Sequence, residues 1–435
     1  MARVQLEKKS RIHFIGIGGI GMSALARFMV AEKKHVSGSD RALTPLTKTL
    51  VAEGITVMSP QSPDNITKDI ELVVYTEAVT EGSEGWAELE RAKELRIPCV
   101  NLFEADGLAF NPYYLIAVAG THGKTTTTAM ITDIFEAAEK DPTAIIGSLR
   151  AKTKSNMRYG KSKYAIIEAC EYKKDFLHLT PDVLVITNIE LDHVDFYKDL
   201  AAVQDAFREL IERVNEDGII VADVSDPAVA PVLQGCTKKI IDYKQFLDLN
   251  LKLKLPGIHN RLNAAAALAA ASTQKIAPEM AREALEQFAG TWRRFEYKGD
   301  CNGAPVYDDY AHHPTAISLT VAAARELYPD KRVTIIFEPH TYSRTAQLFN
   351  EFAKALATAD RVILLPIFAA REENKWGVSS RELAVKTLEH TRNVRFATNP
   401  DEVATDLKHT LTDHDVVIAM GAGKDVSPLA EELTK

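Results

Sequence analysis

The chain has 435 residues, which at about 150 residues per domain suggests roughly three domains. Apolar residues make up 46% and charged residues 26% of it, a composition that argues against a disordered, fibrous or coiled-coil protein. The 52 Lys and Arg residues against 60 Asp and Glu residues give a net charge of −8. We expect no nucleic-acid partner, because such proteins usually carry a basic field.

Cysteine usage and hydropathy favour a cytoplasmic protein. None of the four cysteines belongs to a CxxC pair, so neither a disulfide framework nor a zinc site is expected. The first residues, MARVQLEKKSRIHF, lack the apolar core of a secretory signal. The apolar run at 263–271 is too short to cross a bilayer, so no membrane association is expected.

Short β-branched runs alternate with helical patterns along the whole chain, which is typical of parallel α/β layers. We expect an α/β fold of three domains, with boundaries at 1–110, 111–293 and 294–435. The helix-breaking FNP sequence at 110–112 marks the first boundary. The expected strands of the first unit are 11–17, 35–39, 71–76 and 97–101, with a helix from the glycine-rich turn to about residue 33.

The second and third units continue the alternation. In the second unit, 249–255 (LNLKLKL) alternates and predicts a half-exposed strand, and a helix is expected over about 260–271. The other expected strands are 113–120, 164–170, 183–188 and 218–223 in the second unit, and 304–309, 331–337, 360–365, 394–397 and 415–420 in the third.

The first glycine motif, Gly16-x-Gly18-x-x-Gly21, directly follows a strand and opens a helix. Glycines there let backbone N–H groups approach a pyrophosphate at the helix N-terminus. Asp40 ends the next strand, where a carboxylate could bind a ribose hydroxyl. Alone, the pattern favours a nucleotide-type ligand, first of all NAD, over a merely tight strand–helix turn.

The second glycine motif, AGTHGKTT at 119–126, has the same placement and adds a cation. Gly120, Gly123 and Lys124 predict a shortened phosphate-binding loop, with Lys124 at the terminal phosphates of ATP and the Thr125 hydroxyl on Mg²⁺. The position of the first glycine in a strict P-loop is occupied by Val118.

Acids and histidines follow the next two strands. Glu168 and Glu171 come after one strand, and His193 lies in TNIELDHVD after another. Near a triphosphate such residues favour a Mg²⁺ site, whereas elsewhere they would be an ordinary solvated loop. Asn260 and Asn263 lie three residues apart at a helix start, where one of them is expected to be the N-cap.

Two further motifs lie in the third unit, TWRRFE followed by YDDYAHHPT, and EPHTYSRT. Each could be a charged surface loop. However, six of the twelve histidines lie in the motifs at strand-to-helix junctions, where α/β active sites form. These histidines are His122, His193, His259, His312, His313 and His340.

Taken together, these motifs resemble the Mur ligases, the ATP-dependent amide ligases of peptidoglycan synthesis, over nearly the whole chain. The sequences that carry the resemblance are GIGGIGMSALA, SGSD, AGTHGKTTTT, EACEY, TNIELDHVDFY, HNRLNA, RRFE, DDYAHHPTAI and PHTYSRT. It implies a Rossmann-like N-terminal domain, a central P-loop-type ATPase domain and a Rossmann-like C-terminal domain that closes over ATP. Agreement is best with the members that add L-alanine.

The resemblance implies that ATP phosphorylates the lactyl carboxylate of UDP-N-acetylmuramate and that the L-alanine amine attacks the acyl phosphate. It also implies two Mg²⁺ ions and a monomer or weak dimer. The first glycine loop would then hold UDP rather than NAD. Implied catalytic residues are Lys124, Glu168, His193, Arg294 and Asp309, and implied metal ligands are Thr125, Glu168 and His193.

The implied binding residues fall into three groups. ATP would contact Gly120, Thr121, His122, Gly123, Lys124, Thr125, Thr126, His259, Asn260, Asn263, Arg294 and Asp309. The UDP-linked substrate would contact Gly16, Gly18, Gly19, Gly21, Met22, Asp40, Thr76 and His122. The amino-acid side would include His312, His340 and Arg344.

The sequence departs from the usual family pattern at four places. Thr341 stands where many members have Arg, Cys170 stands where many have Asp, and the stretch 242–256 is short. The helix expected over 199–214 has no lysine, and Phe207 occupies the position at which several later-acting members carry a carbamylated lysine. We therefore expect activity that does not depend on CO₂.

Three alternatives remain open at this point. The nearest is the Mur-type ligase that attaches a ready-made tripeptide to UDP-N-acetylmuramate during murein recycling, for which PHTYSRT and ACEY are less typical. An NAD(P)-dependent oxidoreductase would explain the first glycine motif alone. A nucleotide-sensing module without catalysis is the third.

Overall fold

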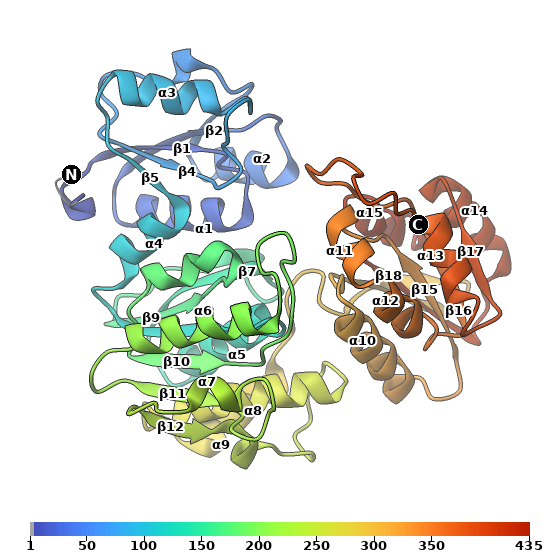
Figure 1. Ribbon diagram of the computed structural model, residues 1–435. Helices are drawn as coiled ribbons and strands as arrows, with labels where there is room; N and C mark the ends of the chain where they lie inside the picture. The colour runs from blue at the N-terminus through green and yellow to red at the C-terminus, as the bar shows by residue number, and fades with distance from the viewer. Residues whose placement is uncertain (1–3) are drawn as a thin grey trace.

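A computed structural model describes residues 4–435 and contains three α/β units, each built on its own sheet (Figure 1). The expected α/β fold of three domains is confirmed. The sheets span 11–101, 114–242 and 296–420. The domain boundaries at 110/111 and 293/294 stay a prediction.

The N-terminal sheet is wholly parallel, and its central strand β1 leads into the first glycine loop. The spatial order is β3 (Thr56–Met58), β2 (His35–Ser39), β1 (Arg11–Ile15), β4 (Leu72–Tyr75) and β5 (Cys99–Asn101). The helices are η1 (Leu6–Lys8), α1 (Ile20–Ala31), α2 (Pro45–Ala52), η2 (Pro63–Asn65), α3 (Trp86–Glu94) and α4 (Leu102–Phe110).

The central sheet is parallel except for its edge strand β8, and β6 at its middle leads into the second glycine loop. Its order is β12 (Lys239–Asp242), β11 (Ile219–Ala222), β10 (Val183–Ile186), β6 (Tyr114–Ala119), β9 (Tyr164–Glu168), β7 (Thr143–Arg150) and β8 (Ser155–Arg158). The helices are α5 (Lys124–Ala137), η3 (Tyr172–His178), α6 (Leu200–Arg213), α7 (Ala230–Leu233), η4 (Tyr243–Phe246), α8 (Ile258–Ser272) and α9 (Pro278–Gln287).

The third sheet is parallel except for the antiparallel edge strand β13. Its order is β13 (Glu296–Cys301), β14 (Ala304–Asp309), β18 (Asp415–Met420), β15 (Arg332–Phe337), β16 (Arg361–Leu364) and β17 (Val394–Phe396). The helices are α10 (Pro314–Leu327), α11 (Tyr342–Gln347), α12 (Phe349–Leu356), α13 (Ser380–Thr387), α14 (Pro400–Thr410) and α15 (Val426–Leu433).

The first two units share apolar packing, whereas the third has its own. One cluster of buried side chains runs from β1 and α1 across α4 into the central sheet and α6. The third unit is built around two separate clusters, and in Figure 1 it stands beside the stacked pair. Polar contacts connect it to the central unit, including the hydrogen bond from Gly257 N to the Glu326 carboxylate (3.1 Å).

Two sequence expectations for the central unit were wrong. Residues 249–255 form no strand, because Arg261 takes up the carbonyls of Leu249 and Leu251 and the inward leucines pack in the core beside α8. Neither Asn260 nor Asn263 is the N-cap of α8, which is Gly257 at φ +94. Asn260 Nδ2 instead donates to the Pro256 carbonyl (2.7 Å).

Strands β3, β7, β8, β12 and β13 were not expected from the sequence. Polar edge segments such as SNMR in β8 lack the β-branched runs that revealed the other strands. Across the described residues, no helix combines the length and apolar character needed to span a membrane. The expected cytoplasmic location stays a prediction.

Candidate functional site

The second glycine loop, Gly120–Thr126, joins β6 to α5 and needs glycine for conformation and space. Gly120 has φ +137, and a Cβ there would lie 2.0 Å from Thr187 Oγ1. Gly123 has φ +82, and a Cβ there would lie 2.3 Å from Asn263 Oδ1. Asn263 of α8 therefore packs directly on the loop. This position agrees with the contact to ATP that the resemblance implies for Asn263.

Lys124, at the start of α5, is held by buried acceptors. Its Nζ donates to the carbonyls of Gly120 (2.5 Å) and Thr121 (3.2 Å) and lies 2.8 Å from a carboxylate oxygen of Glu171, which is 3% exposed. Burial alone would lower the pKa of Lys124, but the Glu171 carboxylate raises it above its ordinary value. The ammonium is therefore charged, fixed at the loop and ready to meet phosphate oxygens.

Thr125 and Glu168 form the arrangement expected of a magnesium site. Thr125 Oγ1 donates to Glu168 (3.1 Å), and the other carboxylate oxygen accepts from Gly147 N (2.8 Å). Hydroxyl and carboxylate oxygens are the ligands that Mg²⁺ prefers, so these two residues fit the implied ion. Arg294 of the third unit reaches the same hydroxyl, with its Nη2 3.4 Å from Thr125 Oγ1.

His193 lies against Glu171, which its position after the same strand as Glu168 had predicted to be a magnesium ligand. Its Nε2 is 3.4 Å from Glu171 Oε1, and its ring packs on Tyr172 with centroids 4.8 Å apart. Glu171 thus links His193 to Lys124, and its pKa, which burial would raise, is lowered by these two partners. The contact of His193 with Glu168 expected for a second ion stays a prediction.

The first glycine loop, Gly16–Gly21, is built differently. The N–H groups of Gly16 and Ile17 donate to the Ser39 carbonyl (2.8 and 3.0 Å), and Gly18 N donates to the Asp40 carboxylate (2.8 Å). Thr76 covers Gly16, since a Cβ on that glycine would lie 2.5 Å from its methyl group. The structure thus gathers the glycines, Asp40 and Thr76 at one end of the sheet.

Three other residues implied in binding the UDP-linked substrate, Gly19, Gly21 and Met22, have structural roles at the start of α1. The side chain of Met22 is 1% exposed and packs in the core, so it presents no surface to a ligand. Gly19 is the N-cap of α1. A Cβ on Gly21 would lie 2.9 Å from Leu102, so this glycine permits close packing of α1 and α4.

The third unit brings charged side chains toward the second loop. Asp309, at the end of β14, is 8% exposed and accepts hydrogen bonds from Phe295 N (2.6 Å) and Ala311 N (2.7 Å). Its burial raises the pKa of this carboxyl above its usual range, although Arg294 opposes the shift. Arg294 also stacks over Tyr310, 5.0 Å from the ring centroid.

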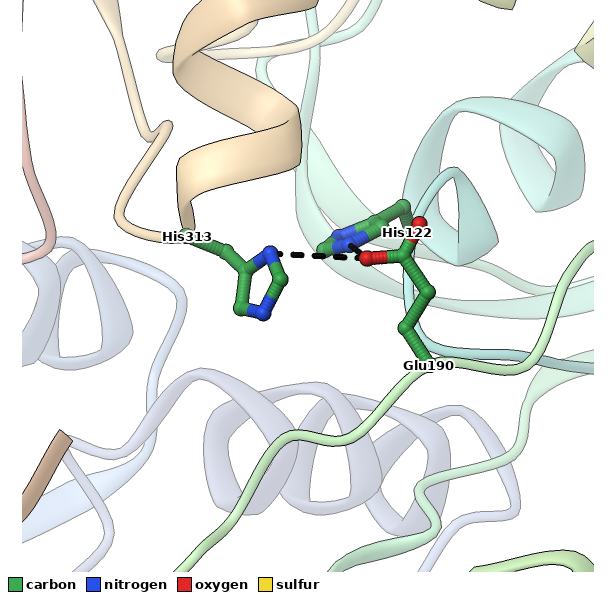
Figure 2. A group of neighbouring side chains, drawn as sticks. All are labelled: His122, Glu190 and His313. Atoms are coloured by element: carbon green, nitrogen blue, oxygen red, sulfur yellow. Dashed lines mark hydrogen bonds and ion pairs between the residues drawn. The ribbon is translucent and has the colours of Figure 1, made fainter. Parts of the chain in front are cut away.

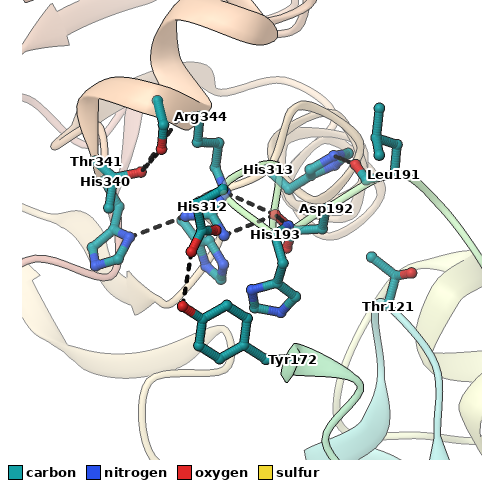
Figure 3. A network of polar contacts seen from close by, with 12 residues as sticks. Thr121, Tyr172, Leu191, Asp192, His193, His312, His313, His340, Thr341 and Arg344 are labelled. Carbon is teal, nitrogen blue, oxygen red and sulfur yellow. Dashed lines mark hydrogen bonds and ion pairs between the residues drawn. The ribbon is translucent and has the colours of Figure 1, made fainter. Parts of the chain in front are cut away.

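A buried polar network ties the central unit to α11 of the third unit (Figure 3). Asp192 accepts from Arg344 Nε (2.9 Å), and Arg344 Nη1 lies 3.0 Å from His340 Nδ1. Burial would raise the pKa of Asp192, but Arg344 holds it well below the usual range. Burial lowers the pKa of His340 to about 4 and that of His312 well below its ordinary value.

This network places His312, His340 and Arg344 together, as the implied amino-acid side requires. The rings of His312 and His340 lie 6.0 Å apart. The sequence did not reveal that Asp192 already neutralises Arg344. Thr341 has φ +65, and its hydroxyl accepts from Arg344 N at the start of α11.

The remaining predicted residues lie near the second loop. His122 Nε2 is 3.3 Å from Glu190 Oε2, and the His122 ring lies 4.9 Å from that of His313. His259 is partly buried at the start of α8, and burial lowers its pKa to about 4. Thr126 is 6% exposed in the first turn of α5.

Three family descriptions match consecutive parts of the chain. They are "Mur ligase family, catalytic domain" over residues 11–114, "Mur ligase middle domain" over 118–246 and "Mur ligase, glutamate ligase domain" over 293–423. The fold and the site thus define a three-domain α/β protein with a phosphate-binding loop at its centre. The chain belongs to the Mur ligase family, which confirms the resemblance seen in the motifs.

Individual relatives match over the full length. The UDP-N-acetylmuramate–L-alanine ligase of Agathobacter rectalis is 40% identical, with 100% of each chain covered. That of Caldanaerobacter subterraneus subsp. tengcongensis is 38% identical, covering 97% of this chain and 96% of the relative. The crystal structure of UDP-N-acetylmuramate-alanine ligase from Thermotoga maritima superposes with a TM-score of 0.80 at 28% identity, covering 97% of this chain and 98% of that one.

Proposed function

We propose that this protein is an ATP-dependent ligase that joins L-alanine to the lactyl carboxylate of UDP-N-acetylmuramate, an early step of peptidoglycan synthesis. The observation that carries the proposal is identity of 38–40% over the full length of relatives that bear this name. The polar groups around the second glycine loop supply chemistry that such a reaction needs.

In the proposed reaction, a lactyl carboxylate oxygen attacks the γ-phosphorus of ATP, and ADP leaves. The amine of L-alanine then attacks the carbonyl carbon of the acyl phosphate, phosphate leaves and a proton is released. Phosphoryl transfer depends mainly on positioning and on neutralising charge. Lys124, held by Glu171, and Arg294, which reaches Thr125 from the third unit, are the cations placed to do this.

Thr125 and Glu168 would hold one Mg²⁺, and His193 with Glu168 would hold a second. When bound, such ions neutralise phosphate charge and orient the transferring group. Asn263 would lie beside the nucleotide on the loop, and Asn260 would bind adenine. The catalytic roles of Lys124, Glu168, His193, Arg294 and Asp309 are part of this proposal.

The first glycine loop would hold the UDP pyrophosphate through the backbone N–H groups at the start of α1, because those of Gly16, Ile17 and Gly18 donate within the protein. Arg344, His340 and His312 would face the amino-acid side. An acyl phosphate hydrolyses readily, so the third unit should close over the site to exclude water. We further propose that the protein acts as a monomer or weak dimer.

A phosphate-release assay with ATP, Mg²⁺ and UDP-N-acetylmuramate, run against an amino-acid panel and the L-alanyl-D-glutamyl-diaminopimelate tripeptide, tests this function. We expect release only when a small L-amino acid is present, with L-alanine best. Release with the tripeptide and none with L-alanine would identify the recycling ligase instead. A titration with NAD(P)H that shows tight binding would favour the oxidoreductase.

A further inference from the structure

A cluster of three metal-ligating side chains lies on the seam between the central and third units (Figure 2). His122 lies in the second glycine loop, Glu190 lies in the segment after β10, and His313 is the N-cap of α10. One ligand atom from each of the three lies within 4.8 Å of the others. The roles proposed above do not use Glu190 or His313.

We propose that His122, Glu190 and His313 bind a transition-metal ion such as Zn²⁺, distinct from the magnesium site at Thr125 and Glu168. Two imidazoles and one carboxylate form a donor set typical of first-row divalent ions, whereas Mg²⁺ prefers sites in which oxygen ligands predominate. The donors come from both sides of the seam, so a bound ion would hold the third unit against the second glycine loop.

Two of the three donor separations fit direct coordination, and all three donors lie within 4.8 Å of one another. Four ligands placed tetrahedrally about 2.1 Å from Zn²⁺ are separated from one another by about 3.4 Å. Glu190 Oε2 lies 3.3 Å from His122 Nε2 and 3.6 Å from His313 Nδ1. An ion could therefore sit between these atoms with small side-chain adjustments, and the fourth position would be taken by water or a ligand.

Neighbouring groups already orient two of the donors. His313 Nε2 lies 3.3 Å from the Leu191 carbonyl, so a proton on this nitrogen leaves Nδ1 unprotonated, as a metal ligand must be. Thr315 Oγ1 donates to Glu190 Oε2 (2.7 Å), which fixes the carboxylate. Such outer partners are characteristic of metal ligands.

A metal ion that binds here would displace existing hydrogen bonds, and it can reach the cluster from solvent. His313 Nδ1 also accepts a hydrogen bond from Thr315 N (3.3 Å), which an ion would displace, and the proton between His122 and Glu190 would be released. The side chain of His313 is 7% exposed, but those of His122 and Glu190 are 20% and 34% exposed. Solvent therefore reaches the cluster from the central-unit side.

The test is a Zn²⁺ titration of the full chain against a chelating dye, with excess Mg²⁺ present throughout. Two variants address the site, Glu190→Gln and His313→Asn, the second because asparagine is also a favoured N-cap for α10. His414→Gln, in an exposed His–Asp contact at 3.8 Å, is the matched control. Glu168→Gln reports zinc captured at the proposed magnesium site instead.

We expect one Zn²⁺ per chain, weakened about tenfold or more in both site variants and unchanged in His414→Gln and Glu168→Gln. Bound Zn²⁺ should raise the Tm of the wild-type protein and not that of the site variants, because a ligand of the folded state stabilises it. If His313→Asn fails to fold, Glu190→Gln alone decides. Equal zinc affinity in wild type and Glu190→Gln, loss of binding in Glu168→Gln, or no zinc binding by the wild type would overturn the proposal.

Discussion

The two glycine loops occupy the same place in their sheets and surround it with different chemistry. Each follows a central parallel strand and opens a helix, β1 and α1 in one unit, β6 and α5 in the next. The first loop gathers backbone N–H groups, with Asp40 on Gly18. The second contains Lys124 and is contacted by Glu168 and Arg294.

The strand–turn–helix unit by itself therefore supplies only a backbone cradle at a helix N-terminus. The charged side chains around it decide whether a bound phosphate is merely held or is transferred. We therefore propose that the first loop holds the UDP-linked substrate and that the second loop transfers the phosphoryl group. Variants of each loop should then affect different steps of the reaction.

Removing the Lys124 ammonium should strongly slow phosphoryl transfer at the second loop. We expect Lys124→Ala to lower kcat about 10³-fold, as loss of a group that stabilises transition-state charge does. Because Glu171 is 3% exposed and would lose its main counter-ion, the variant should also lose about 3–5 kcal/mol of stability. Single-turnover kinetics and urea denaturation measure the two effects.

The double variant Lys124→Ala/Glu171→Gln separates them. Removing the stranded charge should restore much of the stability while kcat stays low. A Lys124→Ala protein with near-native kcat would remove the lysine from phosphoryl transfer.

Glu168→Gln tests the metal proposed for the second loop. One carboxylate oxygen accepts from Thr125 and the other from Gly147, so an amide of the same shape keeps the packing but loses the charge. We expect kcat to fall about a hundredfold and the half-saturating Mg²⁺ concentration to rise. Glu94→Gln, in an exposed helix pair, is the control, and an unchanged Mg²⁺ titration in Glu168→Gln would leave this carboxylate without a metal role.

Gly16→Ala should weaken the binding of UDP-N-acetylmuramate and leave the binding of ATP unchanged. Gly16 has φ +83, and a Cβ there would approach Thr76 Cγ2 to 2.5 Å, so the loop must shift. We expect the KM for UDP-N-acetylmuramate to rise about tenfold, with the KM for ATP unchanged. Gly54→Ala, at φ +89 in open space, imposes the backbone strain without the contact and should leave both KM values unaltered. Equal rises in both KM values for Gly16→Ala would mean that the loops do not serve separate ligands.

The smallest expected effect is that of CO₂. Phe207 of α6 is fully buried, and its ring packs edge-on against Phe176 with centroids 5.3 Å apart. No lysine occurs between Lys198 and Lys238, so this helix offers no amine for carbamylation. Activity in CO₂-depleted buffer should equal that with bicarbonate. Activity lost on CO₂ removal and restored by bicarbonate would place a carbamylated lysine elsewhere in the site.

The sequence predicted the two loops and the fold class because glycine spacing and β-branched runs are local signals. It placed Lys124, Thr125 and Glu168 at one site, and the structure brings them there. It did not predict the Asp192–Arg344 pair, since these residues are 152 positions apart and meet only when the third unit docks.

The sequence also could not fully predict the structure of residues 249–255 or the contacts of Glu171. The alternation in 249–255 correctly indicates that Leu251, Leu253 and Leu255 point inward, although Leu249 is exposed. It cannot show that Arg261, rather than a neighbouring strand, takes up the backbone carbonyls. Glu171 stands three residues after Glu168, and that spacing was the one available signal that a second acid reaches the lysine.

The central claim is that the second loop transfers phosphate from ATP to a carboxylate held through the first. It is tested most directly with UDP-N-acetylmuramate carrying ¹⁸O in its lactyl carboxylate. If a carboxylate oxygen attacks the γ-phosphorus and phosphate later leaves the acyl carbon, each phosphate released with L-alanine contains one oxygen from that carboxylate. We predict one ¹⁸O per phosphate by mass spectrometry. Phosphate free of ¹⁸O, formed alongside the amide product, would contradict the account.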